Sequence, residues 1–190
     1  METPTAAFWK RKLAAFLHDP PEKAFDYGPH HVERARIYAQ NLGLDLDEWL
    51  RGNDKADWSA AAADRFLFPS SVPLGGEPAF QHPLSPSGAG PLLTRTDFPD
   101  QTTTEEIVSN VLPTLNAGGE ETFLRVWRRW LQSVVENGAE KRGAEWIGLL
   151  PADTRIPDAT IWHHTAITSA VEATRGDDGQ LHPAFLLVQV

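Results

Sequence analysis

The chain has 190 residues, with 17 basic against 26 acidic side chains, so its formal net charge is −9. Its apolar content of 41%, including seven Trp and nine Phe, is too high for a disordered chain and suffices for one good-sized domain. No apolar run approaches the ~20 residues that span a bilayer. The absence of Cys excludes disulfides, thiolate zinc sites and cysteine nucleophiles. We therefore expect a globular, helical, cytoplasmic protein. Its acidic balance disfavours a protein that coats duplex DNA, but it permits a nuclease whose bound metal supplies positive charge.

Apolar periodicity predicts a helix from Ala6 to His18, which Pro20 and Pro21 terminate because proline donates no backbone N–H. Further helices are expected over 29–43, 45–51 and 54–66. The alanine run in the last of these indicates a close contact with another helix.

Residues 69–100 have a different composition. They contain seven of the fifteen prolines and four of the fourteen glycines, with no sustained periodicity. Loops of this length are uncommon unless they are functional or disordered. We predict a long irregular insertion here.

The helical pattern returns after this insertion. It predicts helices over 103–116, with a capping box at 103–106 and a kink at Pro113, then over 120–136 and 144–150. A last helix is expected to begin with Asp158 as its N-cap. The helix over 120–136 has the clearest apolar stripe, formed by Phe123, Val126, Trp127, Trp130, Leu131 and Val134.

After a turn at 176–179, the apolar run AFLLVQV over 184–190 predicts a buried strand. A single strand has no pairing partner, so we expect it to be the first strand of a following sheet domain that this sequence lacks. The predicted fold class is therefore all-α for residues 1–176.

Five of the seven histidines fall in three short clusters on the predicted helices. Imidazole and carboxylate groups from several elements can share a divalent metal. A shared metal site is one interpretation. The alternative is that these histidines lie on the surface or cap helices, with His18 stabilised by the dipole at the C-terminus of its helix. The residues are His18 beside Asp19, the pairs His30–His31 and His163–His164, and the further carboxylates Asp64 and Asp153.

Arg125, Arg128 and Arg129 form a basic strip opposite the apolar stripe of their helix. Such a strip is typical of a solvated face and less often of a contact with nucleic acid or a partner protein. Because the tryptophans follow the helical stripes, we expect them to pack in the core rather than to stack on bases.

Four segments, in chain order, resemble a known family. They are KLAAFLHDPPEKAF (12–25), HHVERA (30–35), ADWSAAAADRF (56–66) and LLPADTRIPDATIWHH (149–164), of which the last is the most specific. Together they resemble the N-terminal HD domain of the large, polymerase-like subunit of type III-B (Cmr) CRISPR–Cas effector complexes. None of the four segments covers residues 67–145, so these residues are assigned to the domain only by their position between matched segments. The terminal strand resembles the start of the Palm domain of that family.

The resemblance implies a circularly permuted, helical HD fold and metal-dependent cleavage of single-stranded DNA. It implies His18, Asp19, His31 and His164 as ligands of one or two divalent ions, such as Mn, Ni or Mg. It also implies three catalytic residues, which are His18, Asp19 and Lys23. Guide RNA and the other effector subunits are the implied partners of the full-length subunit. The nucleotide cyclase activity of the Palm domains is not assigned to these 190 residues.

One position departs from the family pattern, because His163 stands where that pattern has Asp. If this Asp is a ligand or orients one, the site is altered. A catalytically degenerate HD-fold scaffold that docks within the ribonucleoprotein complex is therefore the alternative to the nuclease. A standalone nucleotide phosphohydrolase is a third interpretation, and it would need no unpaired strand after residue 183.

Overall fold

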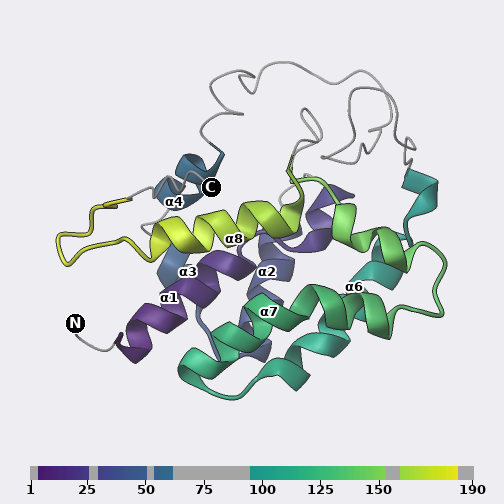
Figure 1. Cartoon of the computed structure of the whole chain (residues 1–190), viewed down its shortest axis with the longest axis horizontal. Helices are drawn as coiled ribbons and strands as arrows, with labels where there is room; N and C mark the ends of the chain where they lie inside the picture. The colour runs from purple at the N-terminus through teal and green to yellow at the C-terminus, as the bar shows by residue number, and fades with distance from the viewer. Residues whose placement is uncertain (1–3, 26–29, 51–53, 62–94, 153–158, 184–190) are drawn as a thin grey trace, which may run out of the picture.

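The computed structural model describes residues 4–25, 30–50, 54–61, 95–152 and 159–183 (Figure 1). These residues form a helical bundle in which the only β-pairing is two isolated bridges. The all-α fold class predicted from the sequence is confirmed for this part of the chain. The elements in order are α1 (Ala6–Leu17), η1 (Pro21–Ala24), α2 (His30–Asn41), α3 (Leu46–Leu50), α4 (Asp54–Ala60), η2 (Arg95–Asp97), α6 (Gln101–Val111), η3 (Leu112–Leu115), α7 (Gly119–Asn137), η4 (Ala144–Leu149) and α8 (Ile161–Glu172).

Helix α1 lies at the centre of the bundle, packed between α7 and α8 (Figure 1). Helix α4 packs on α8, as its alanine-rich sequence predicted, and α6 packs on α7. This arrangement brings together segments that are more than one hundred residues apart, since Ser169 of α8 donates a hydrogen bond to the Lys12 carbonyl of α1. The predicted insertion at 69–100 and the strand at 184–190 lie mostly or wholly outside the described residues.

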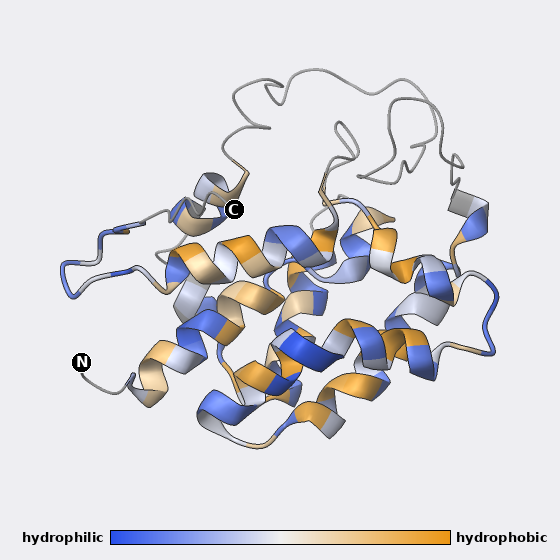
Figure 2. Ribbon diagram, viewed as in Figure 1, coloured by the Kyte–Doolittle hydropathy of each residue, from blue (hydrophilic) through white to orange (hydrophobic). Residues whose placement is uncertain are grey.

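The core is built around the fully buried indole of Trp130 on α7. Its ring lies 5.1 to 6.3 Å from those of Phe16, Tyr38 and Trp162, which belong to three other helices. The tilted and edge-to-face geometry of these pairs is the favoured one for aromatic rings. Figure 2 shows the apolar residues alternating with hydrophilic ones along each amphipathic helix. None of the described helices has the length and hydropathy that crossing a membrane requires.

Two predicted helix starts differ from the observed ones. Helix α6 begins after Asp100, whose carboxylate accepts a 2.8 Å hydrogen bond from the Thr103 backbone N–H, so the predicted capping box at 103–106 is wrong. The α helix stops at Val111, and the predicted kink at Pro113 is a change to the 3-10 helix η3. Helix α8 is capped by Thr160, whose hydroxyl accepts from the His163 N–H, and the predicted cap Asp158 lies outside the described residues.

The prediction that Trp127 is buried is also wrong, because 51% of its surface is exposed. The apolar stripe of α7 is wider than the core that it faces. Phe123, Val126, Trp130 and Val134 are buried and Leu131 is partly buried, whereas Trp127 lies at the edge of the stripe in contact with solvent. The predicted turn at 176–179 is observed, closed by a 2.9 Å hydrogen bond from the Gly176 N–H to the Gln180 carbonyl.

Gly143 is a point at which the fold excludes any side chain. Its φ is +82°, and a Cβ added there would lie 2.1 Å from the Asp97 carbonyl oxygen. Gly43 has a similar φ of +71° but open space around it. We expect Gly43→Ala to cost about 1–2 kcal/mol from backbone strain alone and Gly143→Ala to cost a further ~1–3 kcal/mol from the clash. Urea unfolding of both variants tests this, and equal losses of stability would contradict it.

Glu22 gives the fold a pH dependence. Its side chain is fully buried, with one oxygen accepting a hydrogen bond from the Tyr38 hydroxyl and the other, Oε2, without a hydrogen-bond partner. Burial raises the pKa of Glu22 from 4.5 to about 7, although the Tyr38 hydrogen bond opposes the shift. The folded state therefore binds this proton more tightly than the unfolded chain. Its contribution to stability is complete below pH 4.5 and is lost as the pH rises through 7.

The variant Glu22→Gln keeps the neutral form at every pH. We expect it to match the wild type near pH 4 and to exceed its free energy of unfolding by about 1–3 kcal/mol near pH 8. Urea unfolding of both proteins across this pH range measures the difference between their free energies of unfolding. The other titrating groups are the same in both proteins, so their contributions cancel in this difference. A difference that does not change with pH would show that Glu22 is not the group responsible.

Candidate metal centre

His18 is the C-cap residue of α1, where Pro20 and Pro21 prevent the helix from continuing. Its Nδ1 lies 2.7 Å from the Ala15 carbonyl oxygen. A carbonyl can only accept, so Nδ1 must carry the proton, and in the neutral ring the lone pair is then on Nε2. This Nε2 atom is buried and has no hydrogen-bond partner. Such an atom is expensive to bury unless it has a ligand.

Asp19 follows directly and is 3% exposed. Its Oδ2 accepts a 2.5 Å hydrogen bond from the Lys23 ammonium on η1, one turn further along the chain. Burial favours the neutral acid. The nearby His18 and the Lys23 charge outweigh burial and hold the pKa of Asp19 below its usual value. Asp19 is therefore ionised at neutral pH despite its burial.

Helices α4 and α8 supply two further side chains. His164 on α8 is buried, and its Nε2 lies 2.9 Å from Oδ1 of Asp57 on α4. Asp57 is partly buried, which by itself favours its neutral form. Hydrogen bonding with His164 and the proximity of His18 reverse this effect and lower the pKa of Asp57 strongly. A second ionised carboxylate thus faces the first.

These four residues form one group, which we call the His–Asp cluster: His18, Asp19, Asp57 and His164. One nitrogen or oxygen atom from each lies within 4.8 Å of the others. The Nε2 of His18 is 3.5 Å from a carboxylate oxygen of Asp19 and of Asp57, and the Nε2 of His164 is 3.6 Å from Asp19. Ligands about 2.1 Å from one ion are separated by roughly 3.0–3.5 Å in octahedral or tetrahedral geometry. The described residues therefore have the spacing that a shared cation needs.

The predicted site residues are placed at different distances from this cluster. His18, Asp19 and His164 belong to it, and Lys23 contacts it through Asp19. His31 lies at its edge, with Nε2 3.9 Å from Oδ1 of Asp19 and 22% of the side chain exposed. The second members of the two histidine pairs, His30 and His163, are exposed, and the carboxylates Asp64 and Asp153 lie outside the described residues.

Asp57 was not predicted from the sequence. It lies inside the segment ADWSAAAADRF, between Ala56 and Trp58 of α4. Helix α4 packs on α8, and the Asp57 side chain thereby reaches His164. The sequence indicates only that a carboxylate lies on a predicted helix near an alanine run. The packing of α4 on α8 is needed to show that Asp57 belongs to the cluster.

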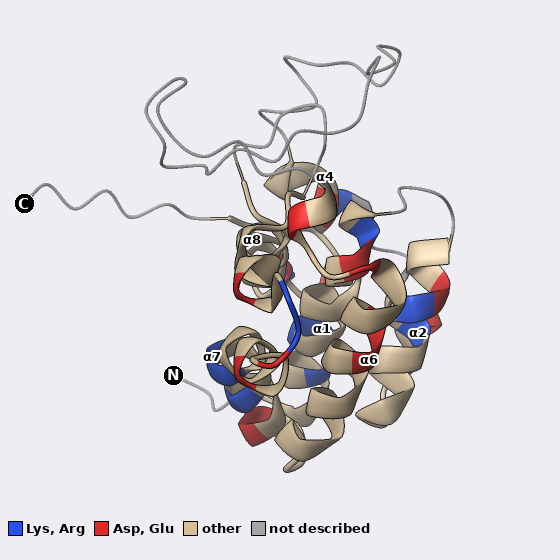
Figure 3. Cartoon of the chain, turned by 90° about the vertical axis from the view of Figure 1, so that its right-hand side faces the viewer, with Lys and Arg blue, Asp and Glu red and all other residues tan. Residues whose placement is uncertain are grey.

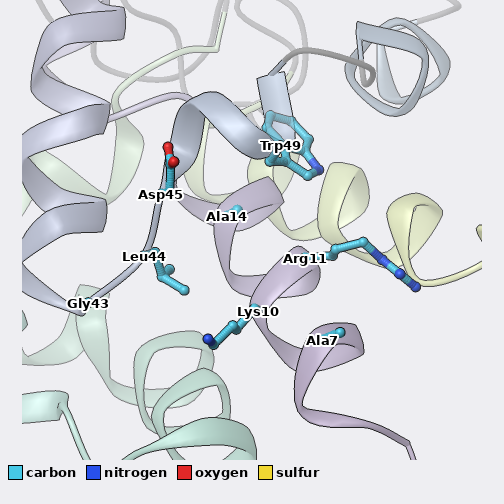
Figure 4. A pocket seen from close by; sticks show the side chains of 8 residues that line it. All are labelled: Ala7, Lys10, Arg11, Ala14, Gly43, Leu44, Asp45 and Trp49. Carbon is cyan, nitrogen blue, oxygen red and sulfur yellow. The ribbon is translucent and has the colours of Figure 1, made fainter.

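Trp49 of α3 closes one side of the cluster. Its ring centroid is 5.5 Å from that of His18. On its other side Trp49 lines a separate pocket of about 350 Å³ against α1. Figure 4 shows Lys10 and Arg11 of that pocket extending in different directions from α1. The pocket is lined by none of the four cluster residues, so Trp49 separates it from His18.

Neither a family model nor, at a significant level, a solved structure matches the chain. Among curated proteins, it is similar to the CRISPR system Cmr subunit Cmr2 of Pyrococcus furiosus, with 24% identity over 214 aligned residues. The alignment covers 85% of this chain and 24% of the relative, so the chain spans about a quarter of the length of the curated protein it matches. This similarity to a Cmr2 protein agrees with the resemblance of the four sequence segments to the large subunit of type III-B complexes.

Proposed function

We propose that this chain is the HD-type domain, over residues 1–176, of a Cmr2-like subunit, and that it hydrolyses single-stranded DNA with a divalent cation. The observation that carries the proposal is the buried, unpartnered Nε2 of His18, held toward two ionised carboxylates and His164. An imidazole that only capped a helix would not need three further metal-ligating side chains gathered around its second nitrogen.

The donor set suits a divalent cation. Two imidazoles and two carboxylates provide mixed nitrogen and oxygen ligands, which favour Mn, Ni or similar metals over Mg alone. When bound, such an ion lowers the pKa of a coordinated water and neutralises phosphate charge. This local positive charge would let a chain of net charge −9 hold a polyanion.

The surrounding residues have separate roles in the proposal. Lys23 holds Asp19 through its ion pair, and in this proposal its side chain, which is 21% exposed, contacts a phosphate of the substrate. His31 stands beside Asp19 at the edge of the cluster. Ala15 acts as a positioning residue, because its carbonyl orients the ring of His18. Assembly with other Cmr subunits and guide RNA is the proposed setting of this activity, through the full-length subunit.

The alternative, a degenerate scaffold, depended on His163. That side chain is exposed, and it lines a groove between α8 and α7, whereas its neighbour His164 lies in the cluster. The departure from the family pattern at this position therefore leaves the four candidate ligands unchanged. This placement favours the nuclease over the scaffold.

The neighbouring histidines of α8 provide a matched test of metal binding. We expect His164→Ala to weaken Mn²⁺ binding at least ~100-fold, because it removes one of the proposed ligands. The matched control His163→Ala should change the affinity by less than about threefold. Isothermal titration of the metal-stripped chain with Mn²⁺ measures both affinities. No binding by the wild type at saturating Mn²⁺ would support the scaffold instead.

Cleavage assays test the activity itself. We expect the wild type with Mn²⁺ to cut single-stranded DNA and the double variant His18→Ala with Asp19→Ala to lose cutting by at least about 1,000-fold. Asp57→Asn, which keeps the shape but removes the charge, should lose a similar amount. EDTA should abolish cutting by the wild type, and His163→Ala should cut normally. Cutting retained in the pure double variant would remove the proposed site.

A further inference from the structure

The exposed indole of Trp127 is part of a groove on a different side of α8 from the His–Asp cluster. The groove has a volume of about 380 Å³ and is lined by residues of α1, α7 and α8. Phe123 stacks beside Trp127 with an interplanar angle of 7°, and Ile167 of α8 is 39% exposed at its edge. Contiguous apolar groups that face solvent are typical of a binding surface, whereas apolar residues exposed singly are common on any protein.

Cations surround this apolar groove. The ammonium of Lys12 lies in it, 4.7 Å from the centroid of the Phe123 ring, and the Arg128 guanidinium lies 5.8 Å from the centroid of Trp127. Arg128 and Arg129 also line an adjoining pocket of about 460 Å³, and Leu124 lines both. Figure 3 shows Lys and Arg residues gathered on the outer side of α7.

These cations lack counterions within the part of the chain that is described. Arg125 forms a 2.5 Å ion pair with Glu121, but no ion pair involves Lys12, Arg128 or Arg129. Partial burial lowers the pKa of Lys12. An anionic partner would supply the missing charge. In a chain of net charge −9, this concentration of uncompensated cations is a local feature.

We propose that this groove binds single-stranded nucleic acid, with bases stacked on Trp127 and phosphates at Lys12, Arg128 and Arg129. Every base offers a π-face to an exposed indole, and arginine beside an aromatic ring strengthens such stacking. A duplex hides its bases and needs a longer row of cations than this surface provides. An acidic peptide could match the charges, but it would leave the flat, solvent-facing Trp127 without a specific role.

The groove is independent of the proposed nuclease centre. Its cations come from α1 and α7, whereas the cluster uses the end of α1, η1, α4 and the other face of α8. Binding can therefore be measured with EDTA present, so that the metal centre makes no contribution. Failure of one proposal then leaves the other standing.

The experiment is a fluorescence anisotropy titration of the full chain against labelled oligo-dT and oligo-rU of about 15 nucleotides. Both should bind in EDTA, with DNA and RNA compared directly. Trp127→Ala should weaken binding at least about fivefold without changing the salt dependence. Arg128→Ala with Arg129→Ala should also weaken it and should reduce the slope of log K against log[NaCl] by about 1.4, or ~0.7 per phosphate contact.

Two control variants accompany these measurements. Arg142→Ala and Lys141→Ala each remove an exposed cation outside the groove, and neither should weaken binding. Circular dichroism melts verify that each variant is folded. The proposal is overturned if neither oligonucleotide binds, or if the Trp127 and arginine variants bind like the wild type. It is also overturned if poly-glutamate of equal charge displaces the oligonucleotide as well as unlabelled oligo-dT does, because the groove would then suit an acidic protein segment.

Discussion

A single hydrogen bond at the end of α1 determines what the His–Asp cluster can do. The Ala15 carbonyl accepts a hydrogen bond from Nδ1 of His18, and Nε2 is thereby directed toward Asp19, Asp57 and His164. The two prolines after Asp19 matter for the same reason, since a longer helix would occupy the Ala15 carbonyl with a backbone N–H.

The cluster is held in an ionised state by charge rather than by exposure to water. Burial alone would neutralise Asp19, yet Lys23 and the two histidines keep it charged. The same holds for Asp57, through His164 and His18. Mutual compensation of this kind links all the members, so that losing one leaves a buried charge without a partner. It also explains why acidic residues can gather at this point of an already acidic chain.

The sequence predicted the part of this arrangement that depends on local pattern. The helix that ends at His18, the amphipathic α7 and the convergence of His18, Asp19 and His164 could be inferred from periodicity, prolines and the family resemblance. Asp57 could not, because its role exists only where α4 packs on α8. Local rules also failed where two candidates competed. Asp100 caps α6 in place of the predicted capping box, and the outermost residue of the α7 stripe, Trp127, has no core to face.

His163 and His164 illustrate how one step along a helix separates two surfaces. Successive residues point about 100° apart, so His164 enters the His–Asp cluster while His163 lines the groove beside Lys12 and Trp127. The family pattern has Asp at the first of these positions. A carboxylate there would place a negative charge among the cations of the groove, whereas histidine is neutral or positive. The departure from that pattern at His163 thus changes the electrostatics of the groove and leaves the composition of the His–Asp cluster unchanged.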